Sequence, residues 1–434
     1  MTTITRAEVV DLRFPTSREL DGSDAMNPDP DYSAAYLRLH TSADDLTGHG
    51  FVFTIGRGND IQANAVASVA DRLVGRDVDG LCDEVGSTAH DLLWDSQLRW
   101  LGPDKGVMHM AIGAVVNAVW DLRARREGRP LWEALMALSP AELVDLVDWT
   151  YLRDALAPGR ARELLEERVG TRAGRLADLE RDGLAAYTTG AGWLGYDDEK
   201  LARLCREAVA AGFTLIKLKV GADLADDHRR LRIARDAVGP DIAIAVDANQ
   251  RWGVDEAIAW VGALADHDLR WIEEPTHPDD VVGHAAIAAA VDVPVATGEH
   301  LANAVLAKQL LQLGGVSVLQ LDATRVGGLH EQLAMALLAA DAGVDVCPHA
   351  GGVGLCEAVQ HLAFFNALAI APRTDTLVLE HVDHLHEHMV TPVEVREAAY
   401  RLPRAPGGGA AFVPTTLATH RYPDGSVWTS APAG

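Results

Sequence analysis

The stretch TLIKLKV, residues 214–220, places two lysines in an otherwise β-branched and aliphatic run. Successive side chains of a strand point to opposite faces, so Lys217 and Lys219 project from the same face, about 6.6 Å apart. Lysines on a strand usually lie on a solvated outer face. The rest of the sequence decides whether this face points outward or into a barrel.

Short apolar runs recur after Gly183 at spacings near 25 residues, and helix-like segments such as 197–211 and 328–342 separate most of them. The runs are residues 184–189, 214–219, 242–247, 269–273, 293–297, 316–321, 344–348 and 376–380. Strands that alternate with helices in this way predict an α/β fold with a parallel (β/α)₈-type TIM barrel. A doubly wound open sheet is the competing architecture.

The N-terminal third has a different pattern. Residues 4–14, 32–40 and 47–55 alternate apolar and polar positions, which predicts three antiparallel strands. Residues 60–138 are mainly helical in pattern, and a further strand is possible at 143–151. We therefore predict an N-terminal α+β domain at residues 1–140, a barrel at 141–390, and a C-terminal segment at 391–434 that returns to the N-terminal domain.

One ionisable residue stands at or just beyond the end of nearly every barrel run. These residues are Lys219, Asp247, Glu273, Glu299, Asp322, His349 and Glu380, at gaps of 28, 26, 26, 23, 27 and 31 residues. Parallel strands all point one way, so groups at their C-terminal ends meet at one mouth of the barrel. Each carboxylate alone is also typical of a helix N-cap, but the regular spacing favours a shared site.

Three of these carboxylates come from consecutive strands. Asp247, Glu273 and Glu299 form an all-oxygen set, which suits Mg²⁺.

A second candidate is the run EHVDHLHEHM at 380–389, which contains His381, His384, His386 and His388. Its spacing matches neither a zinc finger nor HExxH, so a loop or a helix face is favoured over a metal site. The glycines of HAGGVG at 349–354 are also typical of a phosphate cradle, but no basic residue stands nearby.

The composition excludes several classes of protein. A net charge of −25 argues against binding to nucleic acids or anionic membranes. No apolar run approaches the roughly 18 residues of a membrane span, and the N-terminus lacks a signal-peptide pattern, so a cytoplasmic location is predicted. The four cysteines show no CxxC pairing, which favours reduced thiols.

Long motifs along nearly the whole chain resemble the enolase superfamily, its mandelate racemase subgroup, and within it the L-fuconate dehydratase family. The motifs are ELDGSDAMNPDPDYSAAY, FTIGRGND, DSQLRWLGP, GVMHMAIGAV, YTTGAGWLGY, IKLKVGA, VDANQRW, WIEEPTHPDD, PHAGGVGLCE and VDHLHEH. The resemblance implies a modified (β/α)₇β barrel below a capping domain, with the loops 21–30 and 54–60 closing over the substrate.

The same resemblance implies a role for each residue of the constellation. Asp247, Glu273 and Glu299 would bind Mg²⁺, Lys219 would be the base, His349 with Asp322 the acid, and Lys217 and Glu380 would contact the substrate. Lys217 and Mg²⁺ are expected to favour a neutral Lys219, and Glu380 is expected to be protonated. The sequence reading assigns no role to Thr188–Ala191.

The implied reaction is the Mg²⁺-dependent dehydration of an acid sugar, L-fuconate, to 2-keto-3-deoxy-L-fuconate by loss of the 2-proton and the 3-hydroxyl. Related aldonates such as L-galactonate, D-arabinonate and D-altronate are alternative substrates. A Schiff-base aldolase also uses a lysine inside a barrel, and a catalytically silent binding protein on the same fold is a third reading. The expected partners are a small acid sugar and further copies of the chain, as a homo-oligomer.

Overall fold

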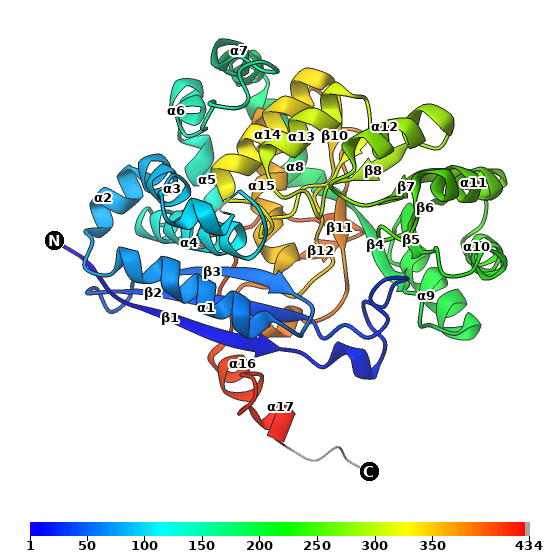
Figure 1. Cartoon of the computed structure of the whole chain (residues 1–434), viewed down its shortest axis with the longest axis horizontal. Helices are drawn as coiled ribbons and strands as arrows, with labels where there is room; N and C mark the ends of the chain where they lie inside the picture. Colours follow the sequence, from blue (N-terminus) through cyan, green and yellow to red (C-terminus); the bar gives the residue numbers. More distant parts are fainter. Residues whose placement is uncertain (103, 430–434) are drawn as a thin grey trace.

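A computed structural model describes residues 1–102 and 104–429 (Figure 1). Its N-terminal part is an antiparallel sheet in the order β1 (Ile4–Arg13), β2 (Ser33–Thr41) and β3 (Thr47–Thr54), which confirms the three predicted strands. The long, largely buried helix α4 (Gly106–Arg126) packs against β3. The other helical elements here are η1 (Thr16–Arg18), α1 (Asn59–Ala70), η2 (Asp71–Leu73), α2 (Val78–Asp83), α3 (Val85–Leu93), η3 (Leu98–Leu101) and α5 (Leu131–Met136).

The prediction of a possible strand at 143–151 is wrong, because helix α6 (Pro140–Asp145) covers the start of this range. Ser139 Oγ accepts the Glu142 backbone N–H, and the Glu142 carboxylate accepts the Ser139 N–H, so the two residues form a capping box. Pro140 occupies the first turn, where its missing N–H costs nothing. The local pattern Ser-Pro-Ala-Glu is a helix start that the apolar alternation hides.

Each of the eight predicted barrel runs contains a strand. They are β4 (Leu184–Gly192), β5 (Leu215–Lys219), β6 (Ala243–Asp247), β7 (Leu269–Glu273), β8 (Val295–Thr297), β9 (Val318–Leu319), β10 (Asp345–Val346) and β11 (Leu379–His381). The parallel ladder runs from β10 through consecutive strands to β4, and β11 pairs in parallel with β4. Because the last of the eight strands lies beside the first, the strand order matches a barrel rather than a doubly wound open sheet.

Helices surround these strands (Figure 1). They are α7 (Pro158–Val169), α8 (Arg172–Asp182), α9 (Asp198–Ala210), α10 (Leu224–Val238), α11 (Val254–Leu264), η4 (Ala265–His267), α12 (Val281–Ala290), α13 (Ala304–Gln312), α14 (Leu329–Ala342) and α15 (Leu355–Ala369). Ile216 and Leu218 belong to the main core, whereas Leu215 packs in a separate small cluster with Trp271 and Cys347. Lys217 and Lys219 share the face of Leu215, so they point into the barrel.

The C-terminal segment follows β11 with the 3-10 turn η5 (His386–His388) rather than an α-helix. Strand β13 (Ala399–Tyr400) then pairs antiparallel with the start of β4, and β12 (Val395–Arg396) pairs antiparallel with β13. Beyond it, α16 (Pro414–Thr419) and α17 (Ser426–Thr429) lie beside β1, where Arg13 N–H donates to the His420 carbonyl. The division of the chain at residues 140 and 390 stays a prediction.

In the part of the chain that the structure describes, no helix combines the length and the apolar character needed to cross a bilayer.

Candidate active site

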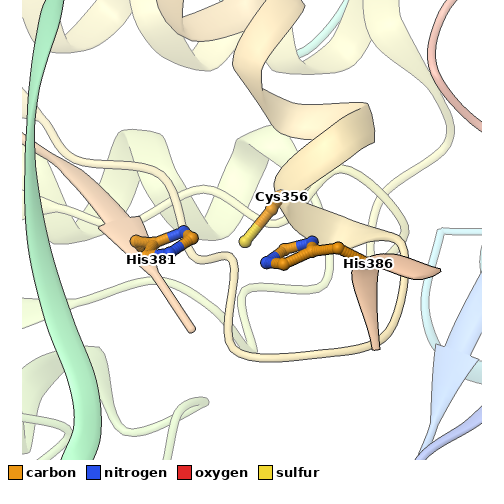
Figure 2. A group of neighbouring side chains, drawn as sticks. All are labelled: Cys356, His381 and His386. Carbon is orange, nitrogen blue, oxygen red and sulfur yellow. The ribbon is translucent and has the colours of Figure 1, made fainter. Parts of the chain in front are cut away.

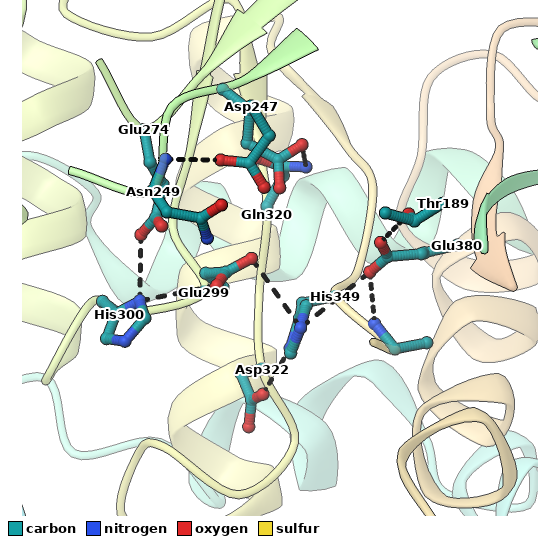
Figure 3. A network of polar contacts seen from close by, with 12 residues as sticks. Thr189, Asp247, Asn249, Glu274, Glu299, His300, Gln320, Asp322, His349 and Glu380 are labelled. Atoms are coloured by element: carbon teal, nitrogen blue, oxygen red, sulfur yellow. Dashed lines mark hydrogen bonds and ion pairs between the residues drawn. The ribbon is translucent and has the colours of Figure 1, made fainter. Parts of the chain in front are cut away.

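The seven ionisable residues converge at the C-terminal mouth of the barrel, and all of them are buried. The parallel register sets Lys219 opposite Asp247, and Asp247 opposite Glu273. Figure 3 shows Glu299, His349 and Glu380 turned toward one another, with Asp322 behind His349. The regular spacing in the sequence therefore corresponds to one compact cluster.

Lys217 and Lys219 both point into the barrel and both approach Asp247 Oδ2, Lys217 at 3.6 Å, but the carboxylate that each contacts most closely differs. Lys217 Nζ lies 2.5 Å from Glu273 Oε1 and 3.0 Å from Glu380 Oε1. Lys219 Nζ lies 2.5 Å from Asp247 Oδ2. Burial opposes both charges, but the neighbouring carboxylates outweigh it and raise both pKa values. Lys217 lowers the pKa of Lys219, as predicted, yet Asp247 has the larger effect. A neutral Lys219 therefore requires that the charge of Asp247 be offset.

The carboxylates of Asp247, Glu273 and Glu299 each offer an oxygen, and these atoms lie within 4.8 Å of one another. Burial raises the pKa of Glu273 and of Glu299, and neighbouring carboxylates add to this effect. Three acidic side chains, each negatively charged when ionised, are thus crowded into one buried space. An all-oxygen donor set with excess negative charge fits a hard divalent cation such as Mg²⁺.

Surrounding groups hold these carboxylates in place. Gln320 Nε2 and Trp271 Nε1 donate to Glu273 Oε2 at 2.7 and 3.2 Å. The backbone N–H of Asn249 donates to Asp247 Oδ1 at 2.8 Å. Each of the two carboxylates therefore keeps a fixed orientation.

His349 and Asp322 form a buried pair. His349 Nδ1 lies 2.7 Å from Asp322 Oδ2, and the backbone N–H and hydroxyl of Thr324 donate to Asp322 Oδ1. Burial opposes the charge on His349, but Glu299 and Asp322 outweigh it and raise its pKa to about 10. The other ring nitrogen, Nε2, lies 3.7 Å from Glu299 Oε2. His349 is thus held as a proton donor whose free N–H faces the cluster.

The expectation of a protonated Glu380 is wrong. Its Oε1 accepts from the Thr189 hydroxyl and the Lys217 ammonium, and its Oε2 accepts from the Ala350 backbone N–H at 2.8 Å. Burial alone would raise the pKa of Glu380, but Lys217 and His349 outweigh burial and lower it. Glu380 is therefore an ionised acceptor, and Thr189, to which the sequence reading gave no role, helps to keep it so.

A cavity of about 240 Å³ lies above these groups, and both parts of the chain line it. The two loops expected to close over a substrate contribute Asp24 and Arg57 among other residues. The sequence reading did not single out Tyr32, His300 or Arg325, which also line it. Two larger cavities, of about 500 and 660 Å³, contain none of the seven groups, so chemistry rather than size identifies the site.

Glu274, the residue after Glu273, is fully buried and adopts a positive φ of 43°. Its Oε1 lies 2.8 Å from Gln250 Nε2 and 3.0 Å from His300 Nδ1. Burial, with Asp247 adding to it, raises the pKa of Glu274 to about 8. The strained backbone is typical of a functional position. A sequence signal exists only in retrospect, as the second glutamate of WIEEP.

Comparisons with known proteins place the chain in a family. Residues 25–136 match the family described as Mandelate racemase / muconate lactonizing enzyme, N-terminal domain, and residues 200–415 match Enolase C-terminal domain-like. The chain is 45% identical to L-galactonate dehydratase from Hypocrea jecorina, over 97% of this chain and 94% of that protein.

Solved structures are similar over the same extent. The crystal structure of human Mitochondrial enolase superfamily member 1 has a TM-score of 0.97 at 44% identity, and the match covers 100% of this chain and 99% of that one. L-Talarate dehydratase from Polaromonas sp. JS666, solved with Mg and L-glucarate, has a TM-score of 0.71 at 27% identity, with 96% of each chain covered.

Proposed function

This chain belongs to the mandelate racemase and muconate lactonizing enzyme group of the enolase superfamily, and from that premise we propose that it is a Mg²⁺-dependent acid-sugar dehydratase. One observation carries the proposal. Lys219 and His349 border the same 240 Å³ cavity as Glu299, beside the buried carboxylates of Asp247 and Glu273, and Asp322 lies behind His349. A base, an acid and a cation site thus surround one substrate-sized space.

We propose L-galactonate as the first substrate to test, ahead of L-fuconate. The similarity to an L-galactonate dehydratase over nearly the full length of both chains supports this order. L-Fuconate is 6-deoxy-L-galactonate, so the two acids share the configuration of carbons 2 to 5 and differ only in the 6-hydroxyl. The L-fuconate family motifs of the sequence and the L-galactonate relative therefore point to one stereochemical class.

The proposed mechanism begins with proton transfer. Lys219 Nζ takes the 2-proton, and the electron pair of that C–H bond moves toward the substrate carboxylate. Bound Mg²⁺, held by Asp247, Glu273 and Glu299, would supply positive charge that stabilises the developing enediolate and offsets the effect of Asp247 on Lys219. Lys217, which stays charged, adds a second fixed positive charge below the cavity.

The second half of the reaction expels the 3-hydroxyl. The electrons return to form the C2–C3 double bond as the C3–O bond breaks, and the proton of His349 Nε2 converts the departing hydroxide to water. Asp322 holds the opposite ring nitrogen and stabilises the imidazolium before transfer. The resulting enol takes up a proton at C3 and becomes a 2-keto-3-deoxy acid. Glu380, as an ionised acceptor, is proposed to position Lys217 and a substrate hydroxyl.

The proposal is tested by incubating the purified protein with L-galactonate, L-fuconate, D-arabinonate, D-altronate and galactarate in the presence of Mg²⁺. Formation of 2-keto-3-deoxy acid is the readout. We expect turnover of the two L-galacto acids, loss of turnover with EDTA, and recovery when Mg²⁺ is restored. Turnover that EDTA leaves unchanged, or trapping of a substrate on Lys219 by borohydride, would instead support the aldolase reading.

The ratio of kcat/KM for L-galactonate and L-fuconate sharpens the substrate assignment. A site that hydrogen-bonds the 6-hydroxyl rejects the deoxy acid by roughly 10⁴-fold or more, whereas an apolar wall discriminates by only about 10–200-fold. A higher kcat/KM for L-fuconate than for L-galactonate would reverse the order proposed here. Homo-oligomer formation and a cytoplasmic location stay predictions.

A further inference from the structure

The four histidines of the run 380–389 have different surroundings in the structure, and only two of them lie against each other. His384 lies against the rings of Tyr32 and Trp193, and His388 Nδ1 pairs with the Thr416 hydroxyl at 2.8 Å. His381 and His386 instead stack in parallel, with ring centroids 5.4 Å apart, and Cys356 from α15 lies between them (Figure 2). The sequence could not reveal this grouping, because Cys356 is 25 residues from His381.

We propose that Cys356, His381 and His386 form a second metal site, separate from the all-oxygen site at the barrel mouth. This site would bind Zn²⁺ or a similar soft or borderline cation. One sulfur and two ring nitrogens lie within 4.8 Å of one another. A thiolate with two imidazoles is a donor set that prefers Zn²⁺ or other soft and borderline cations to Mg²⁺. The two sites are therefore expected to bind different ions.

The first support is an unsatisfied buried nitrogen. His381 is 6% exposed, and its Nδ1 has no hydrogen-bond partner within the described residues. A buried polar atom without a partner is destabilising. Cys356 is fully buried beside it, and its Sγ–H donates to the Ala350 carbonyl at 3.5 Å. A cation between His381 and Cys356 would give the His381 nitrogen a partner.

The second support is a carboxylate behind His386. His386 Nδ1 lies 2.7 Å from Glu357 Oε1, and its Nε2 lies 2.8 Å from the Val382 carbonyl. Metal-binding histidines commonly donate their other ring N–H to a carboxylate in this way. The carboxylate of Glu357 therefore fixes the orientation of the His386 ring, and a cation would take the place of the Val382 carbonyl as the partner of Nε2.

The place of the cluster in the fold gives it access. Because η5 rather than an α-helix follows β11, a cavity of about 660 Å³ remains between β4, α9 and the C-terminal segment. His381 lines this cavity. Three protein ligands leave a fourth position of a tetrahedral ion open toward it.

The test uses Co²⁺ as a spectroscopic probe on the full chain with Mg²⁺ in excess. We expect a thiolate-to-cobalt charge-transfer absorption that saturates at one Co²⁺ per chain. An all-oxygen site cannot produce this absorption. Cys356→Ser should abolish it, whereas Cys205→Ser, which removes another buried thiol on α9, should leave it intact.

A second pair of variants keeps the test decisive if Cys356→Ser does not fold. His381→Gln should lower Co²⁺ affinity, and Glu357→Gln, which weakens the carboxylate behind His386, should lower it by about 10–100-fold. Absence of the absorption in the unmodified protein would overturn the proposal. So would an absorption that persists in folded Cys356→Ser or is unchanged in both His381→Gln and Glu357→Gln.

Discussion

Lys217 and Lys219 are only two positions apart in the sequence, but the groups around their side chains differ. Lys217 is fully buried against Glu273 and Glu380, whereas Lys219 reaches the wall of the cavity. A lysine between two ionised carboxylates keeps its proton. Lys219 has Asp247 as its principal carboxylate partner, so a cation at Asp247 frees it to act as a base.

This difference predicts separable effects of substitution. Lys219→Ala should abolish exchange of the substrate 2-proton with deuterated solvent, since general-base catalysis typically contributes about 10²–10⁴-fold. Lys217→Met should instead raise KM and lower kcat together, with some exchange retained, because it removes a fixed charge rather than the base. NMR of the recovered substrate measures the exchange. Equal exchange in unmodified protein and Lys219→Ala would exclude Lys219 as the base.

The contact of Asp322 with His349 predicts that Asp322→Asn shifts the pH dependence of activity. His349 must be protonated to donate, so activity falls as the pH rises through its pKa, which Asp322 helps to raise to about 10. Asp322→Asn should move this alkaline limb to lower pH and reduce kcat about 10–100-fold. Rates measured across the pH range on L-galactonate provide the check. An unshifted alkaline limb would mean that another group is the acid.

Residue identities at the site were largely predictable, because one titratable group per βα unit is visible in the sequence. Protonation states were not. The charge of Glu380 depends on a hydroxyl from Thr189, an N–H from Ala350 and the ammonium of Lys217, which come from three separate segments. Such contacts exist only after folding, so spacing cannot reveal them.

At the scale of elements, the contact of β4 with β5 fixes where the lysines stand. Gly192, the last residue of β4, has no room for a side chain, since an added Cβ would lie 2.3 Å from the Lys217 carbonyl oxygen and 2.5 Å from Leu218 Cα. Gly190 on the same strand has room, because the nearest atom to its added Cβ is Thr188 Oγ1 at 3.7 Å. These glycines form a matched pair.

We expect Gly192→Ala to lower the free energy of unfolding by about 1–3 kcal/mol, as overpacking does, and to lower activity by displacing β5. Gly190→Ala should change the free energy of unfolding by less than about 1 kcal/mol. Denaturant unfolding of both variants measures the difference. If the two alanines cost the same, the close contact of β4 with β5 is not what limits residue 192.

Elements with a clear period were predictable, and those set by local caps or by distant partners were not. The barrel strands follow from apolar runs that alternate with helices. Helix α6 depends on the Ser139–Glu142 capping box, which is a shorter signal than strand alternation. The grouping of His381 and His386 depends on α15, which the run itself does not contain.

For the whole molecule, activity depends on how the capping part sits on the barrel. Helix α4 contacts the barrel through a hydrogen bond of 2.7 Å between His109 Nε2 and Glu331 Oε2 and through Asn117, whose amide donates to the Ala323 carbonyl. Met110 of α4 and Arg325 of the barrel both line the cavity. The roof and the floor of the site are therefore held together by this helix.

Gly113 of α4 lies where this helix approaches the barrel closely, so a substitution there tests the contact between the two. An added Cβ would lie 2.1 Å from the Val326 carbonyl oxygen, which must move and take the neighbouring Arg325 with it. A misplacement near 1 Å can cost about 10²-fold in rate, so Gly113→Ala should reduce kcat/KM by roughly tenfold or more and lower the free energy of unfolding by about 1–3 kcal/mol. Gly174→Ala on α8, where nothing lies within 4 Å, should instead stabilise the helix by about 0.5–1 kcal/mol without loss of activity. Steady-state kinetics and denaturant unfolding of the two variants give the comparison. If Gly113→Ala and Gly174→Ala have the same kcat/KM and the same free energy of unfolding, the spacing between α4 and the barrel does not determine the geometry of the active site.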